Sequence, residues 1–289
     1  MIIGSFTRVL FGKFAVTAWT FDVCPNSLLN SCVHNVQVLE LLSSSPRAID
    51  IYSHCAMSSV VEFAPTNMDE YILPTSGYPP KMFVRRGDKG HAAEAPRSLN
   101  DYISAEEKLE IALEMAKAIA VMHGFKDGVI ANADVQIGQF FRGSDGVIKI
   151  VDYNRAEPLL YDRKDGRYCP WTNGYPGEGT LRAPEENIDA PLTEQVDVFS
   201  LGNVFFALLT GTHVWHGHRD FDKRIHRIVE GEQRKIPDFY YKEPSSRLLA
   251  EAITMCWTYY AEERPSIFDL VQLLEQAVAE HPVIEDSWG

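Results

Sequence analysis

The sequence is short of positive charge and has no long apolar run. Its 289 residues contain 27 Lys and Arg against 40 Asp and Glu, which gives a formal net charge of −13. A nucleic-acid partner is disfavoured, because non-specific affinity for a phosphate backbone comes from basic surface. No apolar stretch approaches the roughly 20 residues of a membrane-spanning helix, so we expect no membrane segment in this chain.

Cysteines and secretion signals are scarce as well. The five cysteines are widely separated and form no CxxC pair, so the sequence indicates neither a disulfide framework nor a cysteine metal site. The apolar start of the chain is interrupted by Arg8 and Lys13, which is untypical of a secretory signal peptide. No Asn-x-Ser/Thr glycosylation acceptor occurs. We expect an intracellular, cytoplasmic protein.

Short runs of β-branched and aromatic residues dominate residues 1–64. The runs are SFTRVLF, FAVTAWTFDV, IDIYSH and SSVVEFA, and one helix-like segment, NVQVLELLSS, lies among them. Such runs are typical of strands, so we predict a small β-rich lobe. Residues 65–103 hold clusters of proline and glycine with little periodicity. This composition predicts a hinge with a short helix, followed by an inserted surface loop.

Helical spacing dominates residues 104–281. Ser104 and Glu107 form a predicted capping box, after which apolar residues recur at i, i+3 and i+4. Four further segments with apolar faces are predicted as helices: 193–211, 219–230, 245–257 and 266–279. An irregular stretch is expected at 157–187 and a C-terminal tail at 282–289. The fold class is α+β, with a small β-rich lobe joined to a larger, mainly helical lobe.

Two aspartates lie at the ends of strand-like runs on either side of a tight GSDG turn. Asp134 follows the first run and Asp152 ends the second. Phosphate transfer needs one carboxylate near the attacking hydroxyl and another that holds a metal ion on the phosphates. Aspartates at strand ends also commonly cap backbone amides. Both interpretations of the pair stay open at this point.

Five short motifs follow one another through the last two thirds of the chain. They are ANADVQIGQ, VDYN, RAPEE, DVFSLGNVF and EERPS. In this order they resemble the catalytic loop, the metal-binding Asp-Phe-Gly, the Ala-Pro-Glu motif, the buried-aspartate helix and the final-helix arginine of the eukaryotic-type protein kinase domain. The chain resembles a divergent kinase domain or pseudokinase with a degraded or truncated N-terminal lobe, which implies the two-lobe kinase-like fold.

The resemblance implies roles for residues of the catalytic loop. Asp134 matches the family's catalytic base, and Asp152, 18 positions later, matches its metal-binding aspartate. Gln139 stands where the family has a metal-binding asparagine and offers the same amide oxygen, so Asp152 and Gln139 are expected to hold Mg²⁺. Asn132 replaces the histidine that braces the loop. Gln136 replaces a lysine near the transferred phosphate, and its lack of charge implies a slower catalyst.

The resemblance also implies nucleotide-binding residues in the first lobe. Gly4 would begin a shortened glycine-rich loop, and Lys13 is the candidate for the phosphate-pairing lysine, although these two residues do not fit one register. A solvent-exposed lysine is the alternative for Lys13. Asn35 stands at the position of the helix glutamate that pairs with this lysine. Glu62 to Ala64 match the hinge whose backbone would contact the adenine of ATP.

Scaffold residues of the family are matched in the second lobe. Glu185 and Arg264 match a buried ion pair that ties the activation segment to the helices. Asp197 matches the aspartate that accepts hydrogen bonds from the catalytic-loop backbone. Active and inactive members carry these residues alike, so they indicate the fold and not the activity.

Three functions are consistent with these features. The first is an ATP- and Mg²⁺-dependent protein kinase domain that transfers the γ-phosphate to a hydroxyl of a protein substrate of unknown identity. The second is a pseudokinase that acts as a binding or regulatory scaffold. The third, a small-molecule phosphotransferase, is disfavoured because the RAPEE segment and Arg264 resemble the peptide-substrate branch of the fold. Retained carboxylates favour the first function, and the unsettled lysine and the missing helix glutamate favour the second.

Overall fold

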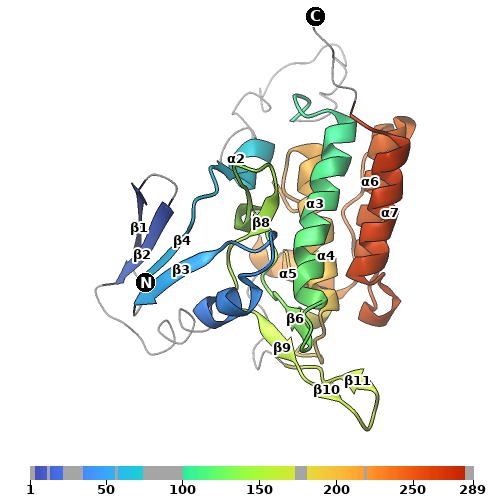
Figure 1. The fold of residues 1–289 in the computed structure, drawn as a ribbon. Helices are drawn as coiled ribbons and strands as arrows, with labels where there is room; N and C mark the ends of the chain where they lie inside the picture. Colours follow the sequence, from blue (N-terminus) through green and yellow to red (C-terminus); the bar gives the residue numbers. More distant parts are fainter. Residues whose placement is uncertain are drawn as a thin grey trace, which may run out of the picture.

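The computed structural model describes residues 4–11, 14–21, 35–55, 58–73, 100–172, 181–217 and 220–283, the first two ranges by their backbone alone. An antiparallel sheet lies at one end of the molecule and a group of long helices at the other (Figure 1). The predicted α+β class is confirmed, with strands first along the chain and a mainly helical region after them.

The N-terminal sheet has four antiparallel strands in the order β1-β2-β4-β3. These strands are β1 (Gly4–Phe11), β2 (Phe14–Phe21), β3 (Ile51–Cys55) and β4 (Ser58–Glu62). Their sequences are rich in the β-branched and aromatic residues that suit a pleated, half-buried surface. A register shift between Ile51 and Ser53 interrupts the pairing of β3 with β4. The sheet ends at Glu62, where the chain leaves for the second part of the molecule.

A helix at residues 35–42 precedes β3 and is tied to the helical part by the loop that follows it. Its apolar residues Val36, Leu39 and Leu42 are buried, at the i, i+3 spacing of one helix face. Further on, the backbone of Ala48 forms a parallel bridge with Ile150. The helix therefore lies against the strand that precedes Asp152, which fixes its position relative to the site.

The connection between the two parts runs through residues 63–65, β5 (Thr66–Asn67) and α2 (Met68–Ile72). The side chain of Asn67 caps α2 by accepting a hydrogen bond from the backbone N–H of Asp69 at 2.9 Å. Such a cap satisfies one of the amide groups left free at a helix N-terminus.

In the described residues of the second part of the molecule, five α-helices have nine residues or more. They are α3 (Ala105–His123), α4 (Gln195–Thr210), α5 (Phe221–Val229), α6 (Pro244–Cys256) and α7 (Ile267–Glu280). Helix α3 begins at Ser104, whose hydroxyl accepts a hydrogen bond from the N–H of Glu107. The Glu107 carboxylate accepts instead from Oη of Tyr71 at 2.6 Å, so only one half of the predicted capping box forms. Helix α4 is apolar on nearly all sides, is buried from Val196 onward, and ends at Gly211 in the left-handed conformation. Helix α4 packs against α3 and α6, and α7 packs against α3 and α6 in turn (Figure 1).

Short strands between α3 and α4 present the loops of the candidate site. Strand β6 (Val129–Ala131) pairs with β9 (Glu157–Leu159), and β7 (Phe140–Arg142) pairs with β8 (Ile148–Ile150) and β5. The GSDG turn joins β7 to β8, with Gly146 at a positive φ of 82° that favours glycine. Asp134 follows β6 and Asp152 follows β8, so these short strands bring the two aspartates to one place.

The stretch at 157–187, expected to be irregular, contains a further hairpin. Strand β10 (Tyr161–Asp162) pairs with β11 (Arg167–Tyr168), and the rings of Tyr161 and Tyr168 meet edge to face with centroids 5.1 Å apart. Two-residue strands give no alternating run in a sequence, so the prediction missed them. The hairpin projects from the helical part of the molecule (Figure 1).

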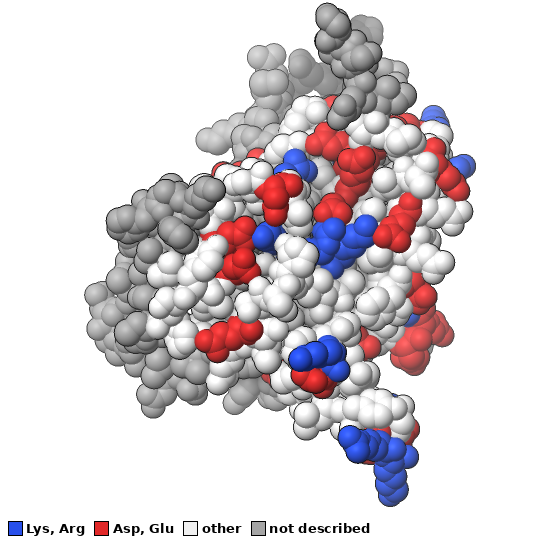
Figure 2. Space-filling view, in the orientation of Figure 1, with Lys and Arg blue, Asp and Glu red and all other residues white. Residues whose placement is uncertain are grey.

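Charge is unevenly distributed over the face shown in Figure 2. Acidic side chains are scattered over much of it. Basic side chains are also spread over it, and one group lies at the tip of the β10–β11 hairpin, whose turn and second strand include Arg163, Lys164 and Arg167. Among the described residues, no helix is both long and apolar enough to cross a membrane.

Candidate functional site

The turn that carries Asp134 is held in place by the buried carboxylate of Asp197. Asp197, in the first turn of α4, accepts hydrogen bonds from the backbone N–H groups of Asn132 and Ala133 at 2.6 and 2.8 Å. Its Oδ2 also lies 2.9 Å from Nε2 of His123. Ala133 has a positive φ of 55°, a conformation that a residue with a Cβ rarely adopts. Both oxygens of Asp197 thus stabilise a strained turn that points Asp134 away from the core.

Asn132 links this turn to the segment that carries Asp152. Its Nδ2 donates to the backbone carbonyl of Asp152 at 2.9 Å, and its Oδ1 accepts from the backbone N–H of Asp134 at 3.1 Å. The sequence showed this residue only as the replacement of a bracing histidine. In the structure the amide, which both donates and accepts, joins the two aspartate segments.

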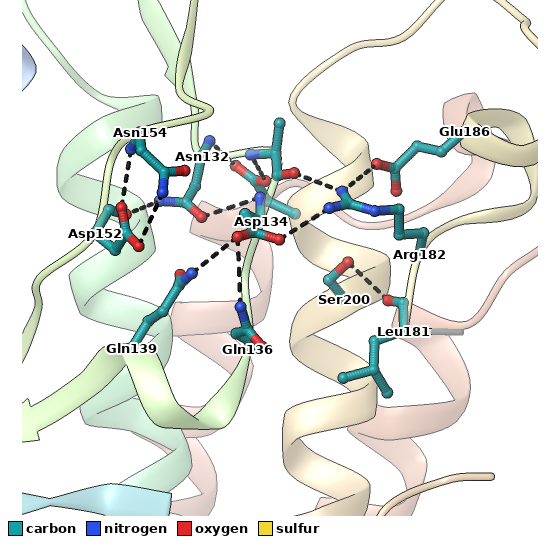
Figure 3. A network of polar contacts seen from close by, with 12 residues as sticks. Asn132, Asp134, Gln136, Gln139, Asp152, Asn154, Leu181, Arg182, Glu186 and Ser200 are labelled. Atoms are coloured by element: carbon teal, nitrogen blue, oxygen red, sulfur yellow. Dashed lines mark hydrogen bonds and ion pairs between the residues drawn. The ribbon is translucent and has the colours of Figure 1, made fainter. Parts of the chain in front are cut away.

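The carboxylate of Asp134 has a partner on each oxygen (Figure 3). Oδ1 lies 2.9 Å from Nη2 of Arg182, and Oδ2 accepts from Nε2 of Gln139 at 3.1 Å and, more weakly, from Nε2 of Gln136 at 3.4 Å. The Asp134 side chain keeps 23% of its surface exposed. Arg182 was not among the predicted site residues, and its place directly before Ala-Pro-Glu was the one sequence feature that could have suggested it.

Asp152 is also half-buried and folds its carboxylate back on its own segment. Its Oδ1 accepts from the backbone N–H of Asn154 at 3.0 Å, and its Oδ2 accepts from the Asn154 side chain at 3.2 Å. Burial raises the pKa of Asp152 above its ordinary value; the Asn154 backbone hydrogen bond opposes this and the negative charge of Asp134 adds to it. Asp152 therefore does cap its own segment, which is the simpler interpretation of this aspartate. The raised pKa shows that these hydrogen bonds do not fully offset the cost of burying its negative charge.

The residues around Asp152 fit a hard divalent cation. Oε1 of Gln139 is buried and has no hydrogen-bond partner, and a buried acceptor in this state is costly. A cation with a preference for oxygen ligands would satisfy this amide and the charge of Asp152 together. The described residues contain no group of three or more His, Cys, Asp or Glu side chains that could hold a metal. Asp152 and Gln139 would therefore need further oxygens from outside the protein, as phosphates supply.

The predicted nucleotide-binding residues are placed only in part. Gly4 is the first residue of β1, described by its backbone alone, and Lys13 lies outside the described residues. Glu62 ends β4 and its carboxylate lies 2.6 Å from Nζ of the buried Lys149, so its side chain is committed to an ion pair. Ala64 is buried in the connection between the two parts.

The buried ion pair expected from the motifs, between Glu185 and Arg264, is present. Arg264 is buried and makes a two-pronged ion pair with Glu185, at 2.5 Å and 2.8 Å. It also donates to the backbone carbonyls of Thr258 and Tyr259. The arginine thereby ties the Ala-Pro-Glu segment to the region just before α7.

Most of the chain matches one known protein family. The sequence model described as the protein kinase domain matches residues 47–276 of the chain, which is well over half of its length. Residues 1–46 lie outside the match. The matched range includes the two aspartate segments, Arg182, and the Glu185–Arg264 pair.

Individual relatives are distant. The dual specificity protein kinase shkB of Dictyostelium discoideum is 22% identical over 205 residues, which are 70% of this chain and 30% of its own length. The EPD1-interacting receptor-like cytoplasmic serine/threonine-protein kinase 5D of Gossypium barbadense is 28% identical over 185 residues, 58% of this chain and 38% of its own length. The MDIS1-interacting receptor like kinase 1 of Arabidopsis thaliana is 24% identical over 213 residues, 68% of this chain and 20% of its own length. The chain thus spans well under half of each of these relatives.

Proposed function

Because the chain belongs to the protein kinase domain family, we propose that it binds ATP with Mg²⁺ and transfers the γ-phosphate to a hydroxyl of a protein substrate. The observation that carries this proposal is the convergence of Asp134, Asp152 and the unpartnered amide oxygen of Gln139 at the ends of β6, β7 and β8 (Figure 3). Both carboxylates are half-buried, so each keeps some surface that a substrate or a metal ion can reach.

Asp134 would orient the substrate hydroxyl and accept its proton. The hydroxyl oxygen forms a bond to the γ-phosphorus, the bond from that phosphorus to the bridging oxygen of ADP breaks, and the hydroxyl proton passes to Asp134. Each carboxylate oxygen has two lone pairs, so Oδ1 can accept this hydrogen bond while it keeps Arg182. Catalysis of this kind depends on positioning, and the Asp197 contacts under the turn supply it.

Asp152 and Gln139 would hold the metal. Mg²⁺, when bound, neutralises charge on the phosphates and orients them for transfer. Asn132 keeps the segment of Asp152 at a fixed distance from the turn of Asp134 by its two hydrogen bonds. In the first lobe, the backbone between Glu62 and Ala64 would meet the adenine, and Gly4 and Lys13 remain the candidates for the phosphate contacts.

One observation favours a pseudokinase as the second candidate. Helix 35–42 carries Asn35 where a lysine-pairing carboxylate is expected, and its acidic residue, Glu40, points outward. The Glu40 side chain is 57% exposed and lies 3.4 Å from Nε2 of His54 on the surface. No carboxylate of this helix is therefore available to fix a phosphate-binding lysine, which would leave nucleotide binding weak or unproductive.

A thermal-shift titration with ATP, with and without Mg²⁺, tests the metal–nucleotide site. Ligand binding raises the melting temperature according to the ratio of ligand concentration to dissociation constant. We expect a Mg²⁺-dependent rise that Asp152→Asn removes and Asp134→Asn retains. The same three proteins are then assayed for transfer of labelled γ-phosphate to dephosphorylated casein. Binding and transfer in the wild type, with transfer lost in both variants, supports the kinase. Binding without transfer supports the pseudokinase. No shift at millimolar ATP contradicts the kinase and leaves the pseudokinase scaffold.

A further inference from the structure

The guanidinium of Arg182 lies between two carboxylates, one of them that of Asp134. Nη2 is 2.9 Å from Oδ1 of Asp134, and Nη1 is 3.0 Å from Oε1 of Glu186 and 2.7 Å from the backbone carbonyl of Ala133 (Figure 3). The Arg182 side chain is 9% exposed and that of Glu186 is 1% exposed. The rigid fork of the guanidinium therefore fixes the position of Asp134 relative to its own turn.

Arg182 is the cation that serves this carboxylate. The loop at 132–139 contains neither lysine nor arginine, and in the described part of the chain Arg182 is the one ion-pair partner of Asp134. The site nevertheless collects the negative charges of Asp134 and Asp152 and would receive phosphates as well. The guanidinium of Arg182 places a fixed positive charge directly beside this carboxylate.

The segment that carries Arg182 has other anchors, so the arginine is not needed merely to attach it. The carbonyl of Leu181 accepts hydrogen bonds from Ser200 at 3.1 Å and Asn203 at 2.9 Å. Glu186 accepts from the backbone N–H of Ala183 at 2.8 Å. The Nε–H of Arg182 is moreover buried without a partner, which costs stability and marks a group that packing alone does not explain.

We propose that Arg182 is the positioning residue of Asp134, holding the carboxylate that accepts the substrate proton in one orientation and next to a fixed positive charge. This role rests on the proposed kinase function. Arg182 acts through Asp134 and has no described contact with Asp152 or Gln139, so its loss changes the chemical step and leaves the metal–nucleotide site in place.

The test compares Arg182→Met and Arg182→Lys with the wild type. Phosphate transfer to dephosphorylated casein gives kcat and the KM for ATP, and the thermal shift with Mg²⁺ and ATP reports binding. We expect Arg182→Met to lower kcat by about 100-fold, the size of effect that a misplaced catalytic group produces. The KM for ATP and the thermal shift stay within about threefold of the wild type, because only an interaction of the transition state is lost. Arg182→Lys keeps the charge and recovers about tenfold of the loss.

Arg47→Met is the matched control. The side chain of Arg47 makes a two-pronged ion pair with Glu114 at 2.6 and 3.0 Å, and this pair includes neither of the two aspartates. Its loss therefore lowers the melting temperature and leaves kcat unchanged. A kcat of Arg182→Met within about threefold of the wild type overturns the positioning role alone. If Arg182→Met does not fold, Arg182→Lys decides, and wild-type kcat in that variant, with its different reach and geometry, overturns the role. A wild type that binds Mg²⁺ and ATP and transfers nothing overturns the proposed function and this role together.

Discussion

Oδ1 of Asn35 accepts a hydrogen bond from the backbone N–H of Tyr153 at 2.8 Å, although the two residues are 118 positions apart in the sequence. This contact joins helix 35–42 of the first part of the molecule to the residue that follows Asp152. The sequence showed Asn35 only as a lost carboxylate. In the structure the amide oxygen docks the helix directly on the predicted metal-binding segment, and the docking needs no lysine partner.

Removal of this amide should loosen the segment of Asp152. We expect Asn35→Ala to increase hydrogen exchange of the Tyr153 amide and to lower the Mg²⁺-dependent thermal shift with ATP, because the segment is then held by fewer contacts. Gln37→Ala, an exposed position of the same helix, is the control for helix propensity. Equal exchange at Tyr153 in both variants would contradict the docking role of Asn35.

The buried carboxylate of Glu186 should make stability depend on pH. Burial raises the pKa of Glu186 from 4.5 to about 7, against the opposing pull of Arg182 and of the Ala183 N–H. A raised pKa in the folded state means that the stability from this group is complete below pH 4.5 and is lost as the pH rises through about 7. As the pH rises from 5 to 7, the free energy of unfolding of the wild type should therefore fall relative to that of Glu186→Gln, which has no carboxylate to ionise.

Urea unfolding of both proteins at several pH values measures this difference. The gain is at most about 1.4 kcal/mol for each unit of pH inside the window. Glutamine is nearly isosteric and keeps an oxygen for the N–H of Ala183, so the comparison isolates the charge. A difference between the two proteins that stays constant from pH 5 to 8 would contradict a raised pKa at Glu186.

Much of the helical part could be predicted from spacing alone. The apolar residues of α7 recur at helical intervals, and the structure places this helix at Ile267–Glu280 against a prediction of 266–279. Asp197, Glu185 and Arg264 could be identified because each lies inside a motif whose order along the chain is characteristic. Periodicity and motif order are properties of the sequence, so both can be recognised before the structure is known.

Side-chain partners between distant segments could not be predicted in the same way. Arg182 and Asp134 are 48 positions apart, and their contact depends on how the turn after β6 and the segment before η3 (Pro184–Asn187) are packed on α4. Asn132 and Asn35 were compared only with the residues that they replace, a comparison that says what is lost and not which new hydrogen bonds form. Amide groups donate and accept, so their partners follow from the surrounding backbone.

A buried lysine predicts a second pH dependence, at the alkaline end. Lys108 of α3 donates to Oδ1 of Asn100 at 2.9 Å and to the carbonyl of Leu209 at 3.2 Å, near the C-terminus of α4. Burial lowers its pKa from 10.5 to about 8, which Asp101 partly opposes. A lowered pKa of a base means that the folded state releases its proton first, so wild-type stability rises from about pH 8 to pH 10.

Lys108→Met should lack this rise. Unfolding in urea at pH 7.5 and pH 9.5 should show the free energy of unfolding of the wild type increasing relative to that of the variant. Lys126→Met, at a side chain that is 82% exposed, serves as the control and should follow the wild type. Parallel curves for Lys108→Met and the wild type would mean that Lys108 titrates normally.

The protein should lose more stability when one partner of the buried pair of Glu185 and Arg264 is removed than when both are removed. Arg264→Met leaves the buried Glu185 carboxylate without its cation, and we expect a loss of about 3–5 kcal/mol in the free energy of unfolding.

In the double variant Glu185→Met with Arg264→Met, no charge is stranded, so stability should recover in part over Arg264→Met alone. The recovery stays incomplete, because Arg264 also donates to the carbonyls of Thr258, Tyr259 and Gln195, and these acceptors lose their donor in both variants. Urea unfolding of the wild type, both single variants and the double variant closes the cycle. Additive losses would show that the two charges do not depend on each other, and that Arg264 stabilises the fold through the three carbonyls instead.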